Sequence, residues 1–134
     1  MSAVVHHINI ACVGDPYDLA LFWSVVTGYP LADDDQPGDP QATVAAPGGT
    51  GPALLFMQVP EPKAVNNRVH LDLKPADRTR DEEVERLLAA GAQLVRDQRR
   101  SDGTGWVVLA DPDGNEFCIE RSDSERAGDG PQVS

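Results

Sequence analysis

The feature that most constrains this chain is an internal repeat with an offset of about 63 residues. The segment His7–Ile10 aligns with His70–Leu73, and the segment Gly28–Leu31 aligns with Gly91–Leu94. Self-similarity at a fixed period indicates a repeated supersecondary unit that cannot bury its hydrophobic face alone. We therefore expect two similar halves that pair with each other.

Each half predicts the same order of elements, which is one strand, one helix and three further strands. In the first half, apolar residues at three- and four-residue spacing predict a helix over 17–27. Asp15 and Pro16 suit its start and Gly28 suits its end. The predicted strands are 4–12, 29–32, 42–46 and 53–59 in the first half, and 68–74, 92–98, 105–110 and 115–120 around a helix over 77–90 in the second.

The length of 134 residues predicts a single domain, over 1–122, made of modules 4–60 and 66–121. The tail 123–134 is polar and rich in Gly, Asp and Ser, so we expect it to be disordered. No apolar run is long enough to span a membrane, and the N-terminus does not resemble a signal peptide. Two distant cysteines do not indicate a disulfide framework. These observations predict a cytoplasmic protein.

The charge balance is acidic, with 22 Asp and Glu against 11 Lys and Arg and a formal net charge of −11. A chain of this charge repels the phosphates of nucleic acids and the surfaces of anionic membranes, so neither is an expected partner. The charge serves solubility, or part of it lines a groove for a cationic ligand.

Four segments resemble one known family. They are Phe22-Trp23 with Gly28, Asn67–Leu73, Gly105-Trp106 and Asp111–Cys118. Together they are similar to the glyoxalase-like family of the glyoxalase/bleomycin resistance/dioxygenase (vicinal oxygen chelate) superfamily, over about residues 4–121. The resemblance implies an α+β fold in which two tandem βαβββ modules form an open, cup-shaped mixed β-sheet with helices outside. Chemistry or ligand binding is then expected inside the cup.

The resemblance also raises the question of a metal. Metal-using relatives supply one His from the first strand of each half and one Glu from the last strand of each half. His7 and His70 match the imidazoles, but the carboxylate positions fall on Cys118 and near Leu54 or Leu55. We therefore favour no tightly bound metal. A divalent ion (Zn, Ni, Mn or Fe) remains an alternative, with His7, His70 and Glu120 as its ligands.

Strand alternation extends the candidate site beyond the histidines. It places Asn9 on the face of His7, Asp72 on the face of His70, and Glu120 on the face of Cys118. We expect His70 and Glu120 to be a proton-transfer pair if the protein is an enzyme. The candidate ligand-binding residues are His7, Asn9, Phe56, Gln58, Asp72, Trp106 and Cys118, with Phe56 assigned to the cup side of its strand.

Three functions fit these residues. The leading one is a metal-independent protein that binds or transforms a small metabolite or antibiotic-like compound, as the resemblance to bleomycin resistance proteins implies. The second is a divalent-metal-dependent lyase or isomerase of the lactoylglutathione lyase type. The third is a metal-free enzyme in which His70, with Glu120 or Asp72, moves a proton. Exposed strand edges of a two-module chain also favour a homodimer.

Overall fold

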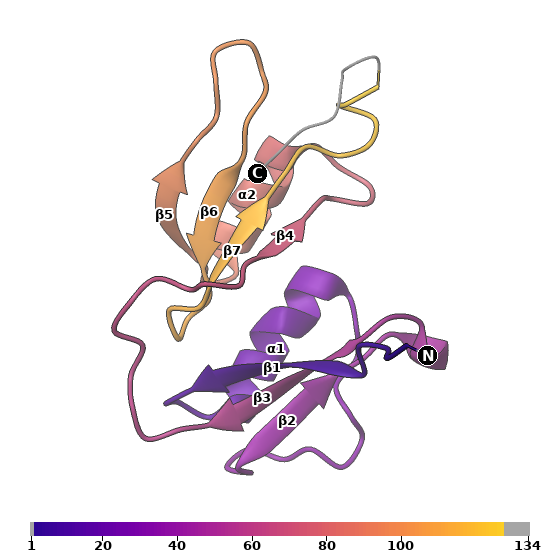
Figure 1. The fold of residues 1–134 in the computed structure, drawn as a ribbon, viewed down its shortest axis with the longest axis vertical. Coiled ribbons are helices and arrows are strands. Elements are labelled where there is room, and N and C mark those ends of the chain that lie inside the picture. The colour runs from indigo at the N-terminus through magenta and orange to yellow at the C-terminus, as the bar shows by residue number, and fades with distance from the viewer. Residues whose placement is uncertain (1, 128–134) are drawn as a thin grey trace. The chain divides into compact units, whose positions relative to one another are not determined.

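The structure is a computed structural model that describes residues 2–127. The chain forms two compact units, and the boundary between them falls after Ala64. Each unit holds a mixed β-sheet and an α-helix (Figure 1). The repeat in the sequence thus corresponds to a repeated α+β unit in the structure.

The first unit contains a three-stranded sheet in the order β1-β3-β2. Its first and last strands, β1 and β3, run parallel, and β2 is antiparallel to β3. Helix α1 packs on β2 and β3. The elements are β1 (His7–Cys12), α1 (Pro16–Thr27), β2 (Gln41–Val44), a short 3-10 turn (Pro47–Gly49) and β3 (Ala53–Gln58).

Helix α1 is bounded by the residues that the sequence indicates. The Asp15 side chain accepts a hydrogen bond from the backbone N–H of Tyr17 (3.0 Å) at its start. Gly28 follows its last residue with a φ of 77°, a left-handed conformation that glycine adopts without strain. The buried side of the helix brings Trp23 against Phe56, with ring centroids 6.5 Å apart. Helix α1 therefore covers the face of the sheet that carries Phe56.

One strand of the predicted first half is reduced to a single bridge. The sequence predicts a strand over 29–32, but only Leu31 pairs there, with Val44 of β2. Two flanking backbone hydrogen bonds remain, from Ala32 to the Thr43 carbonyl and from Ala45 to the Pro30 carbonyl. Proline has no N–H to donate, which limits ladder formation in so short a segment. The first unit is thus βαββ with a residual fourth strand.

The second unit contains a four-stranded sheet in the order β4-β7-β6-β5. Its first and last strands, β4 and β7, again run parallel, and the other pairs are antiparallel. Helix α2 begins with a capping box between Thr79 and Glu82. The elements are β4 (Leu71–Leu73), α2 (Arg80–Ala89), β5 (Gln93–Asp97), β6 (Val107–Ala110) and β7 (Glu116–Ile119).

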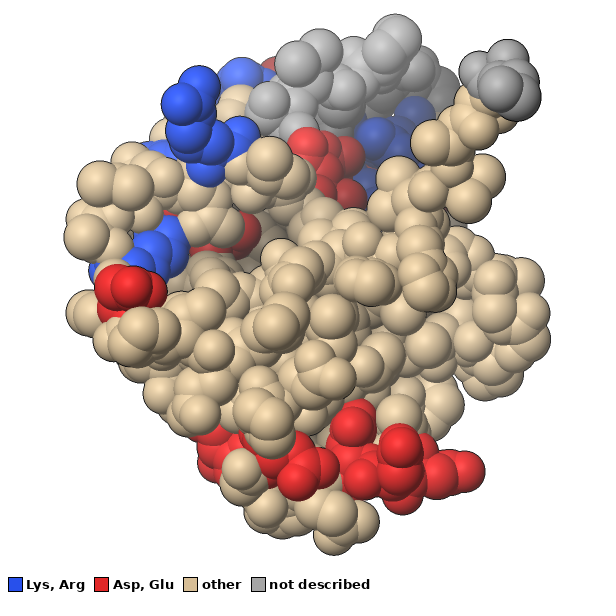
Figure 2. Space-filling view, turned by 60° about the horizontal axis from the view of Figure 1, so that its bottom comes forward, with Lys and Arg blue, Asp and Glu red and all other residues tan. Residues whose placement is uncertain are grey.

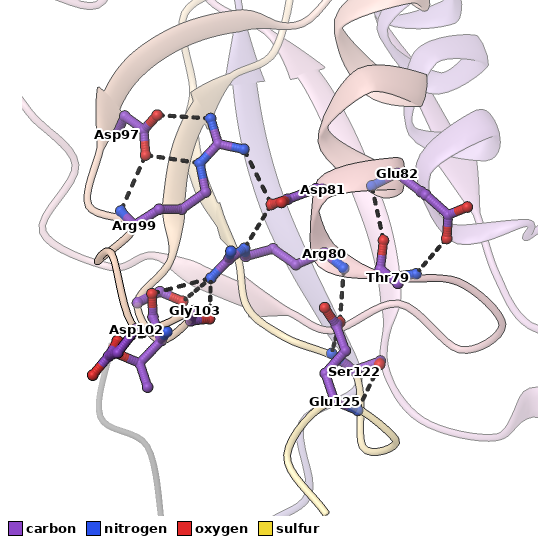
Figure 3. A network of polar contacts seen from close by, with 12 residues as sticks. Thr79, Arg80, Asp81, Glu82, Asp97, Arg99, Asp102, Gly103, Ser122 and Glu125 are labelled. Carbon is purple, nitrogen blue, oxygen red and sulfur yellow. Dashed lines mark hydrogen bonds and ion pairs between the residues drawn. The ribbon is translucent and has the colours of Figure 1, made fainter.

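A buried arginine ties the β5–β6 hairpin to the start of α2 (Figure 3). Arg80 is only 5% exposed, and its Nη1 donates to the backbone carbonyls of Gly103, Thr104 and Gly105 at 3.0–3.2 Å. Asp81 accepts from both Arg80 (3.0 Å) and Arg99 (3.1 Å). These contacts hold the hairpin in one place relative to the helix.

The segment after β7 also contacts α2. The Glu125 carboxylate accepts hydrogen bonds from the backbone N–H groups of Arg80 and Ser122, both at 2.8 Å. The sequence predicts a disordered tail over 123–134. The structure gives Glu125 these contacts, and residues 128–134 of that tail lie outside the described residues.

The basic residues belong almost entirely to the second unit. Lys63 is the single Lys or Arg in the sequence up to Ala64. Figure 2 accordingly shows one area in which acidic side chains gather with no basic side chain among them. No helix within residues 2–127 is long and apolar enough to cross a bilayer.

Candidate functional site

The second sheet has one apolar face and one polar face. Phe117 and Ile119 of β7 are fully buried on the side that α2 covers. On the other side, the strand register pairs Asp72 with Cys118, Cys118 with Val108, and Val108 with Arg96. Paired residues on neighbouring strands share a face, so these four form a row across all four strands. We call the face that carries this row the polar face.

His70 directly precedes β4 and lies on the polar face by alternation from Asp72. Its Nε2 lies 3.1 Å from the carbonyl oxygen of Asn67, and its Nδ1 lies 3.8 Å from Sγ of Cys118. A carbonyl oxygen only accepts, so Nε2–H donates to Asn67. The ring Nδ1 is in contact with the Cys118 thiol, whose single proton is directed either to Nδ1 or to the Asp72 carboxylate. Each nitrogen of the imidazole therefore has a polar neighbour.

The partner of His70 is itself held in place by β7. Glu116 is 6% exposed, and its Oε1 accepts from the backbone N–H of Asn67 at 2.9 Å. The Asn67 side-chain amide donates to the Glu116 carbonyl at 3.3 Å. Glu116 thus fixes the Asn67 loop, and the loop in turn orients the His70 ring.

Cys118 is a protonated thiol at neutral pH. Its pKa is raised to about 12, chiefly by burial and then by the Asp72 carboxylate, which acts through its charge and a hydrogen bond. The Glu120 charge acts in the same direction, whereas the Arg96 charge opposes them. Because the thiolate is the nucleophile and the metal ligand, the thiol is here a hydrogen-bond donor.

Glu120 and Trp106 complete the polar face at the far end from His70. Glu120 shares the face of Cys118, and its carboxylate lies 3.7 Å from the Arg126 guanidinium. Trp106 is half-buried, and the Arg100 guanidinium lies 5.6 Å from its ring centroid. Within residues 2–127, no hydrogen bond joins Glu120 to His70.

The predicted residues of the first unit lie on the helix-free face of its own sheet. His7 and Asn9 alternate with the residues that face α1, and their partners on β3 are Ala53 and Leu55. The Asn9 amide nitrogen lies 2.9 Å from the Met57 sulfur. The three strands of this unit contain no Asp or Glu. This face therefore offers an imidazole and an amide without a carboxylate.

Phe56 lies on the opposite face from the one predicted for it. It is completely buried against Trp23 of α1, so its assignment to the cup side is wrong. Gln58 shares the alternation of Phe56 but stands at the exposed end of β3, where it donates to the carbonyls of Val13 and Gly14 (3.3 and 3.2 Å). It borders an open hollow of about 400 Å³, which is lined by Val13, Gln58, Val59 and Pro60.

The side chains at the positions that the resemblance assigns to metal ligands differ from a set of two imidazoles and two carboxylates. The position beside His70 on β7 holds the Cys118 thiol instead of a carboxylate, and the position opposite Asn9 on β3 holds Leu55. Among residues 2–127, no three His, Cys, Asp or Glu side chains form a group that could hold a metal ion. A two-imidazole, two-carboxylate centre for Zn, Ni, Mn or Fe is thus not built by the residues that the resemblance assigns to it.

Sequence reasoning missed the roles of two residues of this arrangement, namely Asn67 and Arg96. Asn67 belongs to the segment that carries the family resemblance, but its carbonyl acts through a loop that alternation does not describe. Arg96 enters the row only through the register of β5 with β6, which contains an irregularity between Leu94 and Arg96. Counting along one strand therefore did not find it.

Comparisons with known proteins agree with this fold. The model of the glyoxalase-like domain family matches residues 7–120. A glyoxalase/bleomycin resistance/dioxygenase family enzyme from Burkholderia phytofirmans is similar in structure, with a TM-score of 0.66 and 18% identity over 87% of this chain and 97% of that one. The search of curated proteins found no match.

Two further solved structures are similar. Fosfomycin resistance protein FosX from Listeria monocytogenes, with Mn(II) and 1S,2S-dihydroxypropylphosphonic acid, has a TM-score of 0.66 and 17% identity over 96% of this chain and 98% of that one. TioX from Micromonospora has a TM-score of 0.55 and 19% identity over 89% and 98%. At these identities the likeness concerns the fold, whereas the family match spans both units. The chain belongs to the glyoxalase-like domain family.

Proposed function

We propose that this protein binds a small metabolite or antibiotic-like compound on the polar face, without a tightly held metal. The observation that carries the proposal is the chain of contacts from Asn67 through His70 to Cys118. Each imidazole nitrogen has a polar neighbour in this chain of contacts, so the polar face presents fixed polar groups rather than an activated base or nucleophile. Asp72 and Glu120 are the carboxylates that accept hydrogen bonds from the ligand.

A metal-free enzyme that moves a proton is the second candidate. One observation favours it, namely that His70, Asp72 and Glu120 all project from the same face of β4 and β7. In such an enzyme Glu120 or Asp72 takes the proton, and His70 acts once its contact with Cys118 opens. A metal-dependent lyase is the weaker alternative, because the thiol at 118 replaces a carboxylate.

The test is an NMR binding screen of the ¹⁵N-labelled full chain against small metabolites and antibiotic-like compounds. Each ligand is then recovered, and its mass is determined by mass spectrometry. We expect chemical-shift changes centred on Asp72, Val108 and Cys118, and recovery of the ligand unchanged. Asp72→Asn and Glu120→Gln should each weaken binding about ten-fold or more, because each removes a charged acceptor. Asp77→Asn, a matched change in the exposed segment before α2, should leave binding unchanged.

Two results would contradict the proposal. Shifts confined to other surfaces would remove the polar face as the site. Product formation that His70→Ala abolishes would favour the proton-transfer enzyme. Elemental analysis of protein purified without chelator distinguishes the metal-dependent lyase from the proposed function, because the lyase requires one divalent ion per chain.

We also propose that the protein is a homodimer. Strand β5 lies at the edge of its sheet, and all five of its residues are exposed. An exposed edge strand presents unpaired backbone groups to a second chain. Light scattering on the purified protein should give twice the mass of the chain, and a monomer at micromolar concentration would contradict this part of the proposal.

A further inference from the structure

Arg96 is a cation of the polar face without a counter-charge. It is exposed on β5 and pairs with Val108, which in turn pairs with Cys118. Within residues 2–127 its guanidinium makes no hydrogen bond and no ion pair. Neighbouring strands are roughly 4.8 Å apart, so about 14 Å separates the backbone of Arg96 from that of Asp72 across three spacings. Asp72 therefore lies at the opposite end of the row from Arg96, and no ion pair joins the two within the described residues.

The absence of a partner for Arg96 contrasts with the other cations around it. Arg99, three residues later, donates to Asp97 at 2.7 Å and to Asp81 at 3.1 Å. The adjacent Asp97 points to the opposite side of the strand, where Arg99 binds it and lowers its pKa to about 2. The chain has twice as many acidic as basic residues, yet Asp97, the acidic neighbour of Arg96, forms its ion pair with Arg99.

The position of Arg96 is fixed by the hairpin that carries it. Arg80 holds the β5–β6 loop through three backbone carbonyls, and Arg99 at the end of β5 joins the same network through Asp81 (Figure 3). The electrostatic reach of Arg96 across the row is also evident, because its charge lowers the pKa of Cys118 two strands away. A cation on a braced strand is pre-organised to bind an anion.

We propose that Arg96 anchors an anionic group, a carboxylate or a phosphonate, of the small molecule that the polar face binds. This inference rests on the proposed function and names its ligand class. The planar guanidinium matches such oxyanions with two parallel hydrogen bonds. Val108, the cross-strand partner of Arg96, is buried beside it. Asp72 and Glu120 repel an anion, so the ligand lies with its anionic end toward β5 and its hydrogen-bond donors toward β4 and β7.

The test compares two probes of equal shape and different charge, benzoate and benzamide, by NMR titration of the labelled full chain. We expect benzoate to bind the wild-type protein at least ten-fold more tightly than benzamide, with shifts on β5 and β6. Arg96→Gln should weaken benzoate binding at least ten-fold and leave benzamide binding unchanged. Arg78→Gln makes the same charge change beside α2 and should leave both affinities unchanged. Matching spectra of the three free proteins establish that each variant folds.

Equal affinities for benzoate and benzamide in the wild-type protein would overturn the inference, as would benzoate binding that survives Arg96→Gln. No benzoate binding to the wild-type protein would overturn it as well. These results are distinct from failure of the proposed function. If screened compounds bind the polar face regardless of their charge, the result contradicts only the role given to Arg96. If no compound binds that face, the result contradicts the proposed function.

Discussion

The Nδ1 atom of His70 and the Sγ atom of Cys118 lie 3.8 Å apart on the polar face, at the parallel junction of β4 and β7. Each side chain limits the chemistry of the other. The thiol has one proton to donate, toward either the imidazole or the Asp72 carboxylate, and its contact with Nδ1 limits the access of other groups to the ring. Cys118 stands at the position where the family resemblance implies a carboxylate.

The first prediction concerns the reactivity of Cys118 with iodoacetamide. An ordinary cysteine has a pKa of about 8.5, whereas that of Cys118 is raised to about 12. A raised pKa means less thiolate at a given pH, so at pH 8 we expect alkylation of Cys118 to be at least 100-fold slower than that of a model thiol. The rate should keep rising toward pH 12. Mass spectrometry of the peptide that contains residue 118 measures it apart from Cys12.

Asp72→Asn provides the control for this prediction. Removing the Asp72 charge takes away one cause of the raised pKa, so the rate at pH 8 should increase. Burial is the larger cause, and the variant should therefore remain slower than the model thiol. A rate that levels off near pH 9 in the wild-type protein would show that the thiol is unperturbed.

The second prediction is that Gly105→Ala strongly destabilises the second unit. Gly105 has a φ of 96°, and a Cβ there would lie 2.1 Å from the carbonyl oxygen of Gln98. We expect a loss of about 3 kcal/mol in the free energy of unfolding by urea. Gly103→Ala has a similar φ of 90° but open space around the Cβ, and should cost only about 1 kcal/mol. Equal losses of unfolding free energy in the two variants would show that the loop shifts enough to remove the close contact at residue 105.

The third prediction tests the contacts of Arg80. Arg80→Met keeps most of the aliphatic stem but leaves three carbonyls of the β5–β6 loop without their donor. We expect a loss of about 2–3 kcal/mol in the free energy of unfolding. Lys74→Ala removes an exposed ion pair with Asp123 and should change it by less than about 0.5 kcal/mol. A small effect of the Arg80 change would mean that water replaces the guanidinium.

The fourth prediction concerns the turn before β7. Asp111 is 1% exposed, and its Oδ1 accepts from the backbone N–H groups of Asp113 and Asn115, both at 2.9 Å. Asp111→Ala should cost about 2–3 kcal/mol in urea unfolding, because it leaves these donors without their acceptor. Asp34→Ala, in an exposed loop, should stay within about 0.5 kcal/mol. Similar values for the two variants would contradict the role given to Asp111.

The α+β repeat was predictable because local signals and the repeat agree. Asp15 and Gly28 mark the ends of α1 in the sequence, and the structure uses both. The face of Phe56 was not predictable in the same way. Residues 53–57 are apolar throughout, so alternation separates two faces without indicating which one the helix covers.

The candidate site was predictable only in part. Alternation groups His70 with Asp72, and Cys118 with Glu120, because side chains of one strand follow a period of two, and the register places Asp72 opposite Cys118. The contribution of Arg96 depends on the register between β5 and β6, and that of Asn67 depends on a loop carbonyl. Long-range register and loop geometry are not encoded in short periodic patterns.

The parallel pairing of the first and last strands has a consequence for how the chain folds. Strand β1 can complete its ladder only after residue 58 has been synthesised, and β4 only after residue 119. Each sheet thus closes late, through contacts of high sequence separation, which slows folding relative to hairpins. The first unit, however, has all its partners before the second unit begins, so it can acquire its sheet on the ribosome while residues 65 onward are still being made.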